Sequence, residues 1–130
     1  MATLPERSEI RRQAVDSLLP QVDSVTVRAG DNNLGDANKF YQCDKFDGYV
    51  FICDDDLIYS HGYVDFMIEE IEKHNRKAII SLHGRIFNKF PITSYTRDFE
   101  RIFCLRGNKK EQSVHIVGTG VLAFHSSTLS

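Results

Sequence analysis

The sequence is poor in several features that would assign a chain to a class at once. It has no tryptophan, only three prolines, and no apolar run that approaches the ~20 residues of a membrane span. Its N-terminus lacks the charged, apolar and small-residue order of a signal peptide. A transmembrane segment and a secretory leader are therefore not expected.

Charge of one sign is also scarce, because 16 basic and 18 acidic residues leave a formal net charge of -2 at pH 7. Without a block of like charge, neither a nucleic acid nor an anionic membrane is expected as a partner held by charge alone. Cysteine is limited to Cys43, Cys53 and Cys104, which have neither paired metal-ligand spacing nor the even number of a disulfide framework. These features favour a reducing, cytoplasmic location and indicate no particular oligomeric state.

What is present is the composition of an ordinary folded domain. Hydrophobic residues make up 42% and charged residues 26% of the 130 positions, which is too apolar for a disordered chain. A chain of this length buries roughly two-thirds of the surface that it exposes when unfolded. We expect residues 1–130 to form a single domain, either complete or incomplete at its C-terminus.

The N-terminal part of the chain predicts one helix, one strand and one loop. Pro5 suits the first turn of a helix, and apolar residues at helical spacing predict that this helix runs from about residue 5 to 18. The β-branched residues of 22–27 predict a short strand. The segment 28–38 is rich in glycine, aspartate and asparagine, which favour turns, and is expected to be a surface loop.

The middle of the chain predicts two strands joined by a helix. Residues 49–53 are continuously apolar, as expected of a central strand covered on both faces. Residues 62–75 carry apolar side chains at helical spacing, and 77–83 contain a second apolar run. Strand, helix and strand in this order are typical of a parallel crossover.

The last part of the chain is less regular. Residues 84–112 mix aromatic, basic and polar types without a clear period, and they predict a long irregular excursion with one short helix around 98–103. Two short apolar runs, 114–117 and 121–124, predict closing strands, which the glycine-rich segment 118–120 separates.

Three aspartates, Asp54, Asp55 and Asp56, follow the apolar run 49–53 directly. In an extended chain Asp54 and Asp56 share a face, so two carboxylates face one ligand. Adjacent negative charges repel one another unless water or a cation compensates them, and Mg²⁺ or Mn²⁺ prefers oxygen ligands. We favour a metal or phosphate site at this strand end over the alternative of a solvated acidic loop that caps the next helix.

Several separated blocks occur along the chain in a fixed order. They are ATLPER at 2–7, SLLPQVDSVTV at 17–27, LGDANKF at 34–40, DGYVFICDDDLIY at 47–59, AIISLHG at 78–84 and VHIVGTGVLAFH at 114–125. In these blocks the chain resembles the family 2-like glycosyltransferases, which have the nucleotide-sugar-binding GT-A fold. The resemblance extends over most of the chain, and ordered blocks are more specific than a lone D-x-D motif.

The resemblance implies a fold, a cofactor and a reaction. The fold would be α/β, with a GT-A-like (Rossmann-like) mixed, mainly parallel sheet flanked by helices. Asp54 and Asp56 would hold Mn²⁺ or Mg²⁺ against the diphosphate of a nucleotide-sugar donor, and the cation would neutralise the charge that grows there as the sugar leaves. The residues that the resemblance assigns to donor binding are Thr3, Pro5, Glu6, Arg7, Gly35, Asp36, Lys39, Asp54 and Asp55.

The acceptor side and the catalytic base are less defined. The acceptor-side candidates are His83, Gly118, Thr119 and Gly120. The two glycines allow the backbone to approach a substrate closely, and a plain tight turn is an equal alternative. A histidine at a strand end, such as His83 or His125, is more simply a hydrogen-bonded residue than a metal ligand. The base stays unassigned, and the acids that are candidates only by default are Asp98, Glu100 and Glu111.

The chain departs from the family's pattern in two places. Only residues 28–33 separate the LGDANKF block from the preceding block, and the chain ends at Ser130, before the part that usually supplies acceptor contacts. The leading hypothesis is a metal-dependent glycosyltransferase, and the alternative is a non-catalytic nucleotide-sugar or metal-binding remnant. A phosphohydrolase of the haloacid dehalogenase type is less favoured, because Ile58 stands where its motif has threonine or valine. The sequence indicates neither the donor sugar, the acceptor nor the stereochemical outcome.

Overall fold

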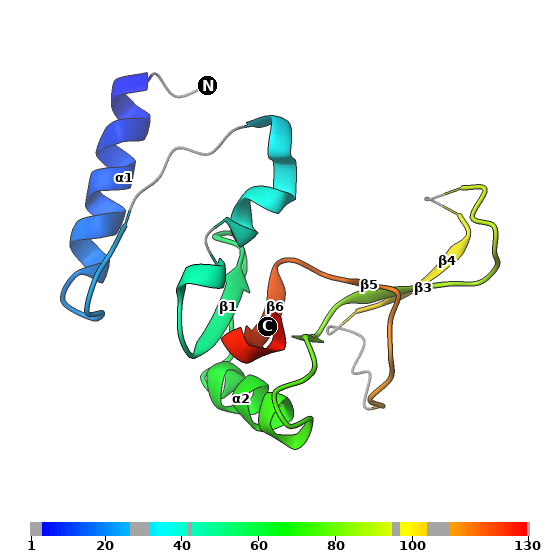
Figure 1. Ribbon diagram of the computed structural model, residues 1–130. Helices are drawn as coiled ribbons and strands as arrows, with labels where there is room; N and C mark the ends of the chain where they lie inside the picture. Colours follow the sequence, from blue (N-terminus) through cyan, green and yellow to red (C-terminus); the bar gives the residue numbers. More distant parts are fainter. Residues whose placement is uncertain (1–3, 27–31, 42, 95–96, 104–109, 130) are drawn as a thin grey trace. The chain divides into compact units, whose positions relative to one another are not determined.

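A computed structural model describes residues 4–26, 32–41, 43–94, 97–103 and 110–129 (Figure 1). The chain divides into two compact units, Met1–Gly35 and Asp36–Ser130. None of the described helices is long and apolar enough to cross a membrane.

The first unit consists mainly of helix α1, Leu4–Leu18. The helix predicted for residues 5–18 is therefore confirmed. The strand predicted for 22–27 is wrong over 22–26, and residue 27 lies outside the described residues. No described strand pairs with this segment, so its β-branched side chains have no pleated surface on which to pack.

The segment predicted as a loop is partly helical. The 3₁₀ helix η1 spans Asn32–Phe40 and is kinked at Gly35, whose φ of 51° is a left-handed conformation that favours glycine. A second 3₁₀ helix, η2, spans Cys43–Lys45. The loop predicted for 28–38 is therefore wrong from residue 32 onward, while 28–31 lie outside the described residues. Asparagine and aspartate favour helix starts as well as turns, which explains the error.

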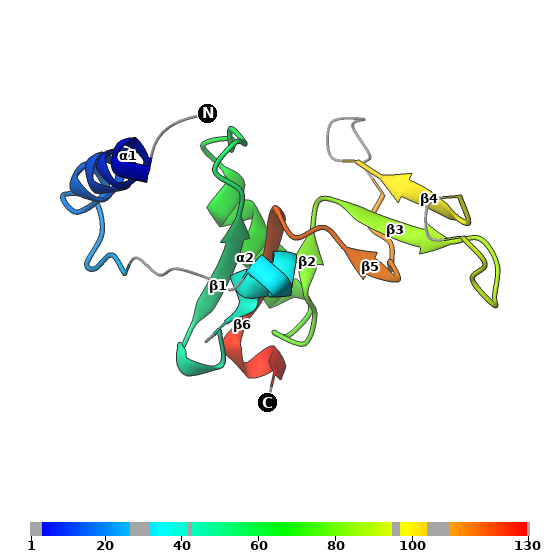
Figure 2. The same ribbon diagram turned by 90° about the horizontal axis from the view of Figure 1, so that it is seen from above.

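Three strands of the second unit form a sheet in the order β1, β6, β2 (Figure 2). These strands are β1 at Tyr49–Cys53, β2 at Ile80–Ser81 and β6 at Val121–His125. Both β1 and β2 pair antiparallel with β6, and Ile52 is opposite Leu122 in this register. The first two strands therefore run in the same direction, but the antiparallel β6 separates them.

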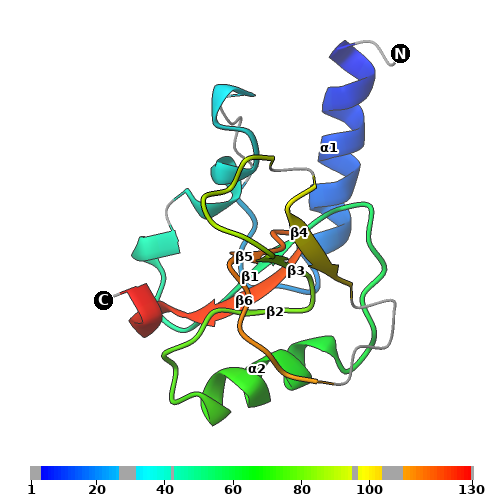
Figure 3. The same cartoon turned by 90° about the vertical axis from the view of Figure 1, so that its right-hand side faces the viewer.

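Helix α2, Tyr63–Lys73, lies along one face of this sheet (Figure 3). It confirms the helix predicted for 62–75. Met67 and Ile71 on its apolar face are fully buried and pack with Ala123 of β6. Burying one such large side chain stabilises the fold by roughly 1.5–3 kcal/mol, so this contact is a main support of the sheet.

The central strand of this sheet is β6 rather than β1. Leu122 and Phe124 pack with Ile52 in one cluster, whereas Ala123 packs with α2 in the other. Successive residues of a strand point to opposite faces, so both faces of β6 are covered. The strand predicted for 49–53 is confirmed as β1, but its predicted central position is wrong, because among the described strands β1 has only β6 as a neighbour.

A second sheet has the order β4, β3, β5 and is antiparallel throughout. Its strands are β3 at Gly84–Phe87, β4 at Phe99–Ile102 and β5 at Ile116–Val117. The irregular excursion predicted for 84–112 is wrong over β3 and β4, and the helix predicted around 98–103 is a strand. The sequence of β4 is too short to show a period clearly, and its pairing with β3 decides its conformation.

The other predicted strands exist with changed lengths. The strand predicted for 77–83 is only the two-residue β2, and 114–117 contains the two-residue β5. The strand predicted for 121–124 is confirmed as β6. After it, the chain forms a last 3₁₀ helix, η4, at Ser126–Leu129.

The fold class implied by the resemblance is wrong. The described residues form two small antiparallel three-stranded sheets, not a mainly parallel sheet flanked by helices. Apolar runs indicate which segments are buried strands, but they do not indicate which strand pairs with which. Here β6 inserts between β1 and β2, so the predicted parallel neighbours never pair.

Candidate functional site

The first aspartate of the acidic run is held at the junction of β1 and β6. The backbone N–H of Asp54 donates to the hydroxyl oxygen of Tyr59 (2.8 Å). That hydroxyl donates in turn to the carbonyl oxygen of Gly120, just before β6 (2.5 Å). Gly120 approaches the Asp54 side chain so closely that a Cβ at this glycine would lie 2.8 Å from the carboxylate carbon. The position of Asp54 therefore depends on a tyrosine and a glycine from two other segments.

Lys39 of η1 forms an ion pair with the carboxylate of Asp54. The two side chains are 29% and 34% exposed, so the pair contributes only about 0.2–1 kcal/mol to stability. The hydrogen bond to Asp54 raises the pKa of Lys39, burial opposes this rise, and the charges of Asp54 and Asp36 add to it. Lys39 is therefore protonated at neutral pH and compensates the charge of Asp54.

Asp55 and Asp56 lie in an exposed turn directly after Asp54. The extended backbone on which the shared face of Asp54 and Asp56 depends ends at Cys53, the last residue of β1. The three carboxylates offer oxygen ligands alone, which suits Mg²⁺ or Mn²⁺. A cation at Asp54 would replace Lys39 as the compensating charge.

A cavity of about 320 Å³ opens in the second unit. Its wall includes Asp36 of η1, His83 between β2 and β3, and Gly118 and Thr119 between β5 and β6. The Gly118 N–H donates to the carbonyl oxygen of His83 (2.8 Å), and a Cβ at Gly118 would lie 2.5 Å from the Cβ of His83. Because no side chain fits between them, these two segments are joined through a glycine at the cavity wall.

Most residues of the second unit that were predicted for donor and acceptor binding lie in one region. Those that line the cavity are Asp36, His83, Gly118 and Thr119. Lys39 and Gly120 instead contact Asp54. Lys39 lies one turn after Asp36 in η1, and Gly120 is next to Thr119, so the cavity and Asp54 are neighbouring parts of one site.

The donor-binding residues predicted near the N-terminus belong to the first unit. Thr3 lies outside the described residues, and Pro5, Glu6 and Arg7 belong to α1. Gly35 is the last residue of that unit, at the kink of η1. A role of these residues in donor binding stays a prediction.

Sequence reasoning missed three residues of this region. Tyr59 links Asp54 to Gly120 through its hydroxyl, and Arg85 and Arg101 line the cavity from β3 and β4. Tyr59 lies five residues after Asp54, in one of the blocks that carry the resemblance. Its position in that block is the one feature of the sequence that could have marked it as a site residue. The two arginines lie in the stretch predicted to be irregular, so the sequence offered no reason to place them on one face of a sheet.

Asp98, one of the acids considered as a base, serves the local loop instead. The Thr93 hydroxyl donates to Asp98 (2.8 Å), as do the backbone N–H groups of Thr93 (2.9 Å) and Ser94 (2.7 Å). These hydrogen bonds lower the pKa of Asp98 to about 2, and the bond from the Thr93 hydroxyl has the largest effect. A carboxylate held in this way is a poor proton acceptor at neutral pH.

The other two acids considered as a base also lie outside the cavity wall. Glu100 is exposed on β4, and Glu111 forms an ion pair with Lys73 (2.6 Å). The titratable side chains in the wall that can accept a proton are those of Asp36 and His83.

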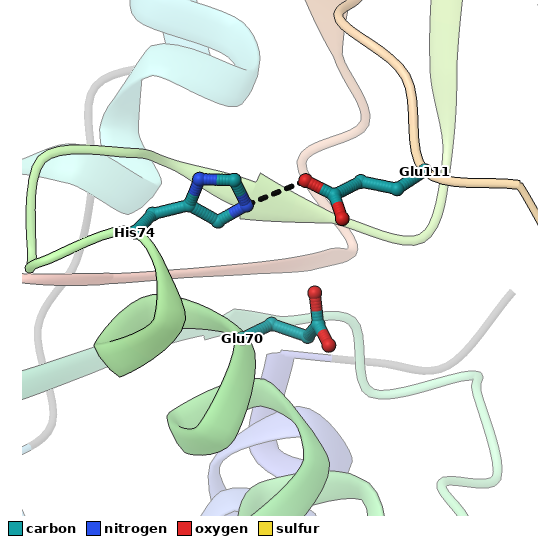
Figure 4. Close-up of side chains that lie close together, drawn as sticks. All are labelled: Glu70, His74 and Glu111. Carbon is teal, nitrogen blue, oxygen red and sulfur yellow. Dashed lines mark ion pairs between the residues drawn. The ribbon is translucent and has the colours of Figure 1, made fainter.

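A second group of candidate metal ligands lies at the surface of α2. Glu70, His74 and Glu111 offer ligand atoms within 4.8 Å of one another (Figure 4). His74 Nε2 lies 2.6 Å from the Glu111 carboxylate, and the Lys73 ammonium lies 3.2 Å from Glu70 and 2.6 Å from Glu111. Lys73 compensates part of the charge of the two carboxylates and lowers the pKa of Glu111, so this group forms an ion-pair network at the surface.

No model of a known protein family matches the chain, and neither does any curated protein.

Proposed function

We propose that the chain is a metal-dependent glycosyltransferase, which transfers a sugar from a nucleotide-diphosphate donor to an acceptor. One observation carries the proposal: Asp54 is in contact with Lys39, from the segment assigned to the donor, and with Gly120, from the segment assigned to the acceptor. A solvated acidic loop would need neither contact. The capping alternative has no support, because the N-cap of α2, Gly62, has no side-chain cap hydrogen bond.

The acidic run fits a hard divalent cation, because its carboxylates are oxygen donors. Asp54 is 34% exposed, and Asp55 and Asp56 lie in an exposed turn. Among the described residues the three aspartates do not form a group of ligand atoms within 4.8 Å of one another, so a cation would have to draw their carboxylates together. When bound, the cation supplies the positive charge that stabilises the departing nucleotide diphosphate. Lys39, released from Asp54, offers a second positive charge to the phosphates.

The neighbouring cavity is the proposed acceptor site. Its volume of about 320 Å³ is near the lower limit for ligand pockets and suits one sugar unit. In the transfer, the acceptor hydroxyl oxygen forms a bond to the anomeric carbon, while the bond from that carbon to the phosphate oxygen breaks. The hydroxyl proton passes to a base, for which the wall offers Asp36 and His83.

A non-catalytic nucleotide-sugar-binding module is the second candidate. It is favoured by one observation, that Asp98, Glu100 and Glu111 all lie outside the cavity wall. Such a module would bind the donor with a metal and leave it intact. Incubation with sugar nucleotides, followed by detection of transfer or of slow donor hydrolysis, separates the two candidates.

The direct test is calorimetric titration of the chain with a panel of nucleoside diphosphates, with and without Mn²⁺. We expect binding that requires Mn²⁺ and is abolished by Asp56→Asn. Asp56 is exposed, so this variant should keep its fold. The matched control is Asp44→Asn, which removes an exposed carboxylate from η2 and should leave binding unchanged.

Unchanged metal-dependent binding in Asp56→Asn would remove the D-x-D assignment. If the unaltered chain binds no nucleoside diphosphate with Mn²⁺, the proposal as a whole fails. Binding without transfer or hydrolysis would identify the chain as the non-catalytic module.

A further inference from the structure

Two arginines stand side by side on one face of the second sheet. Arg85 of β3 and Arg101 of β4 are directly opposite each other in the antiparallel register, so their side chains lie on the same face. Both line the cavity. Like charges in this arrangement destabilise a sheet unless something offsets their repulsion.

The aromatic ring of Phe99 lies beneath both guanidinium groups. Its centroid is 4.6 Å from Cζ of Arg85 and 5.4 Å from Cζ of Arg101. Phe99 pairs with Phe87 two positions along the register, on the same face as the arginines. The π face of this shared ring attracts both guanidinium groups and orients them beside the cavity.

The charge of the cavity wall is positive on balance. The wall contains the two arginines and a single carboxylate, that of Asp36. The described ion pairs of the chain include no partner for Arg101. An arginine fork matches the oxygens of a phosphate or carboxylate in two-point contact, so an oxyanion is the ligand chemistry that this wall recognises.

We propose that the acceptor bound in this cavity is a sugar that carries an oxyanion, either a phosphate or a carboxylate, held by Arg85 and Arg101. The assignment of this sugar as the acceptor rests on the proposed function, but the binding of an oxyanion in the cavity can be tested independently of it. Phe103 and Ile102 provide an apolar part of the wall next to the arginines, which suits the face of a sugar ring.

The test is calorimetric titration of the full chain with glucose 6-phosphate, glucuronate, glucose and inorganic phosphate. We expect the phosphate or the carboxylate sugar to bind, with an affinity that falls as salt is added, and glucose to bind at least about tenfold more weakly. The arm that binds more tightly identifies which oxyanion the acceptor carries. If glucose binds as tightly as both charged sugars, or inorganic phosphate as tightly as either, the inference is overturned.

Variants tie the binding to the arginine pair. Arg101→Gln should weaken the charged sugar at least about tenfold, whereas Arg101→Lys, which keeps the charge, should retain part of the affinity. The matched control is Arg97→Gln, which removes an exposed arginine that does not line the cavity. Circular dichroism checks that each variant is folded, and equal binding in Arg101→Gln overturns the inference.

A parallel titration with a nucleoside diphosphate and Mn²⁺ separates this inference from the proposed function. We expect Arg101→Gln to leave that binding unchanged. If Arg101→Gln weakens it, the arginines hold the donor phosphates and the acceptor inference is wrong. If the charged sugar binds through Arg101 but no nucleoside diphosphate binds, the proposed function fails and the oxyanion site stands.

Discussion

Replacing Gly120 by alanine tests whether close packing positions the Asp54 carboxylate. The new Cβ would lie 2.8 Å from the carboxylate carbon of Asp54 and 3.4 Å from Cδ1 of Leu57. The φ of Gly120 lies outside the left-handed region, so the main chain accepts alanine. The group that must move is the free end of the Asp54 side chain.

The cost of this movement can be worked out from the contacts that it changes. Moving the carboxylate breaks its partly exposed ion pair with Lys39, which is worth about 0.2–1 kcal/mol. A strained rotamer of Asp54 adds about 0.5–1.5 kcal/mol. We therefore expect Gly120→Ala to lower the free energy of unfolding by on the order of 1 kcal/mol. Because groups that orient a metal ligand change affinity by about 10–100-fold, Mn²⁺-dependent nucleotide binding should weaken at least about tenfold.

Chemical denaturation measures the first effect and calorimetric titration the second. In Gly118→Ala, the comparison variant, the new Cβ would lie 2.5 Å from the Cβ of His83 and 3.2 Å from its carbonyl oxygen, which cannot swing away. The free energy of unfolding of Gly118→Ala should therefore fall by about 1–3 kcal/mol. In the control Gly62→Ala the Cβ meets nothing within 4 Å. Unchanged nucleotide binding in Gly120→Ala, or a larger stability loss than in Gly118→Ala, would refute the reasoning.

Two further predictions concern side chains with shifted pKa values. The buried Tyr63 hydroxyl has no hydrogen-bond partner among the described residues, and burial raises its pKa to about 12. Because the folded state disfavours the ionised tyrosine, its contribution to stability is fully present below pH ~10 and is lost as the pH rises toward 12. We expect the free energy of unfolding of Tyr63→Phe to equal that of the unaltered chain or to exceed it by up to ~1 kcal/mol, and to fall less as the pH rises. Urea denaturation at pH values from 7 to 11 measures both effects. The pKa of Asp98 is lowered to about 2 by the hydroxyl of Thr93 and nearby N–H groups, so its stabilising effect is present above pH ~4 and lost as the pH falls to 2. Asp98→Asn should therefore lower the protection of the Ser94 amide against hydrogen exchange at pH 6, and this protection should no longer fall as the pH is lowered to 2. Protection equal to that of the unaltered chain at pH 6 and at pH 2 would contradict this prediction.

The parts of the fold that were predicted correctly are those with a local signal of sufficient length. Helix α2 shows its apolar face over three turns, with Met67 and Ile71 at the core, so a helical period is visible in the sequence. Strand β1 is an uninterrupted apolar run that ends in acids. Strand β4 has four residues and half-buried ends, and such a segment is compatible with a helix until its partner is known.

The candidate site was predicted in part for the same reason. Three adjacent aspartates and a Gly-Thr-Gly segment attract attention in any sequence. Arg85 and Arg101 do not, because each is an ordinary charged residue and only the register of β3 with β4 makes them neighbours. Tyr59 likewise gains its role from the distance between its hydroxyl and Gly120, which are 61 residues apart in the chain.

Local residue patterns specify which segments are apolar, where α1 and α2 form, and where negative charge is concentrated, because these properties depend on residues close together in the chain. Three other features come from tertiary contacts: β6 lies between β1 and β2, Lys39 compensates Asp54, and two arginines line one cavity. Each of these depends on contacts between residues far apart in the chain. Many pairings satisfy the same apolar pattern, and only packing of the whole chain selects one of them.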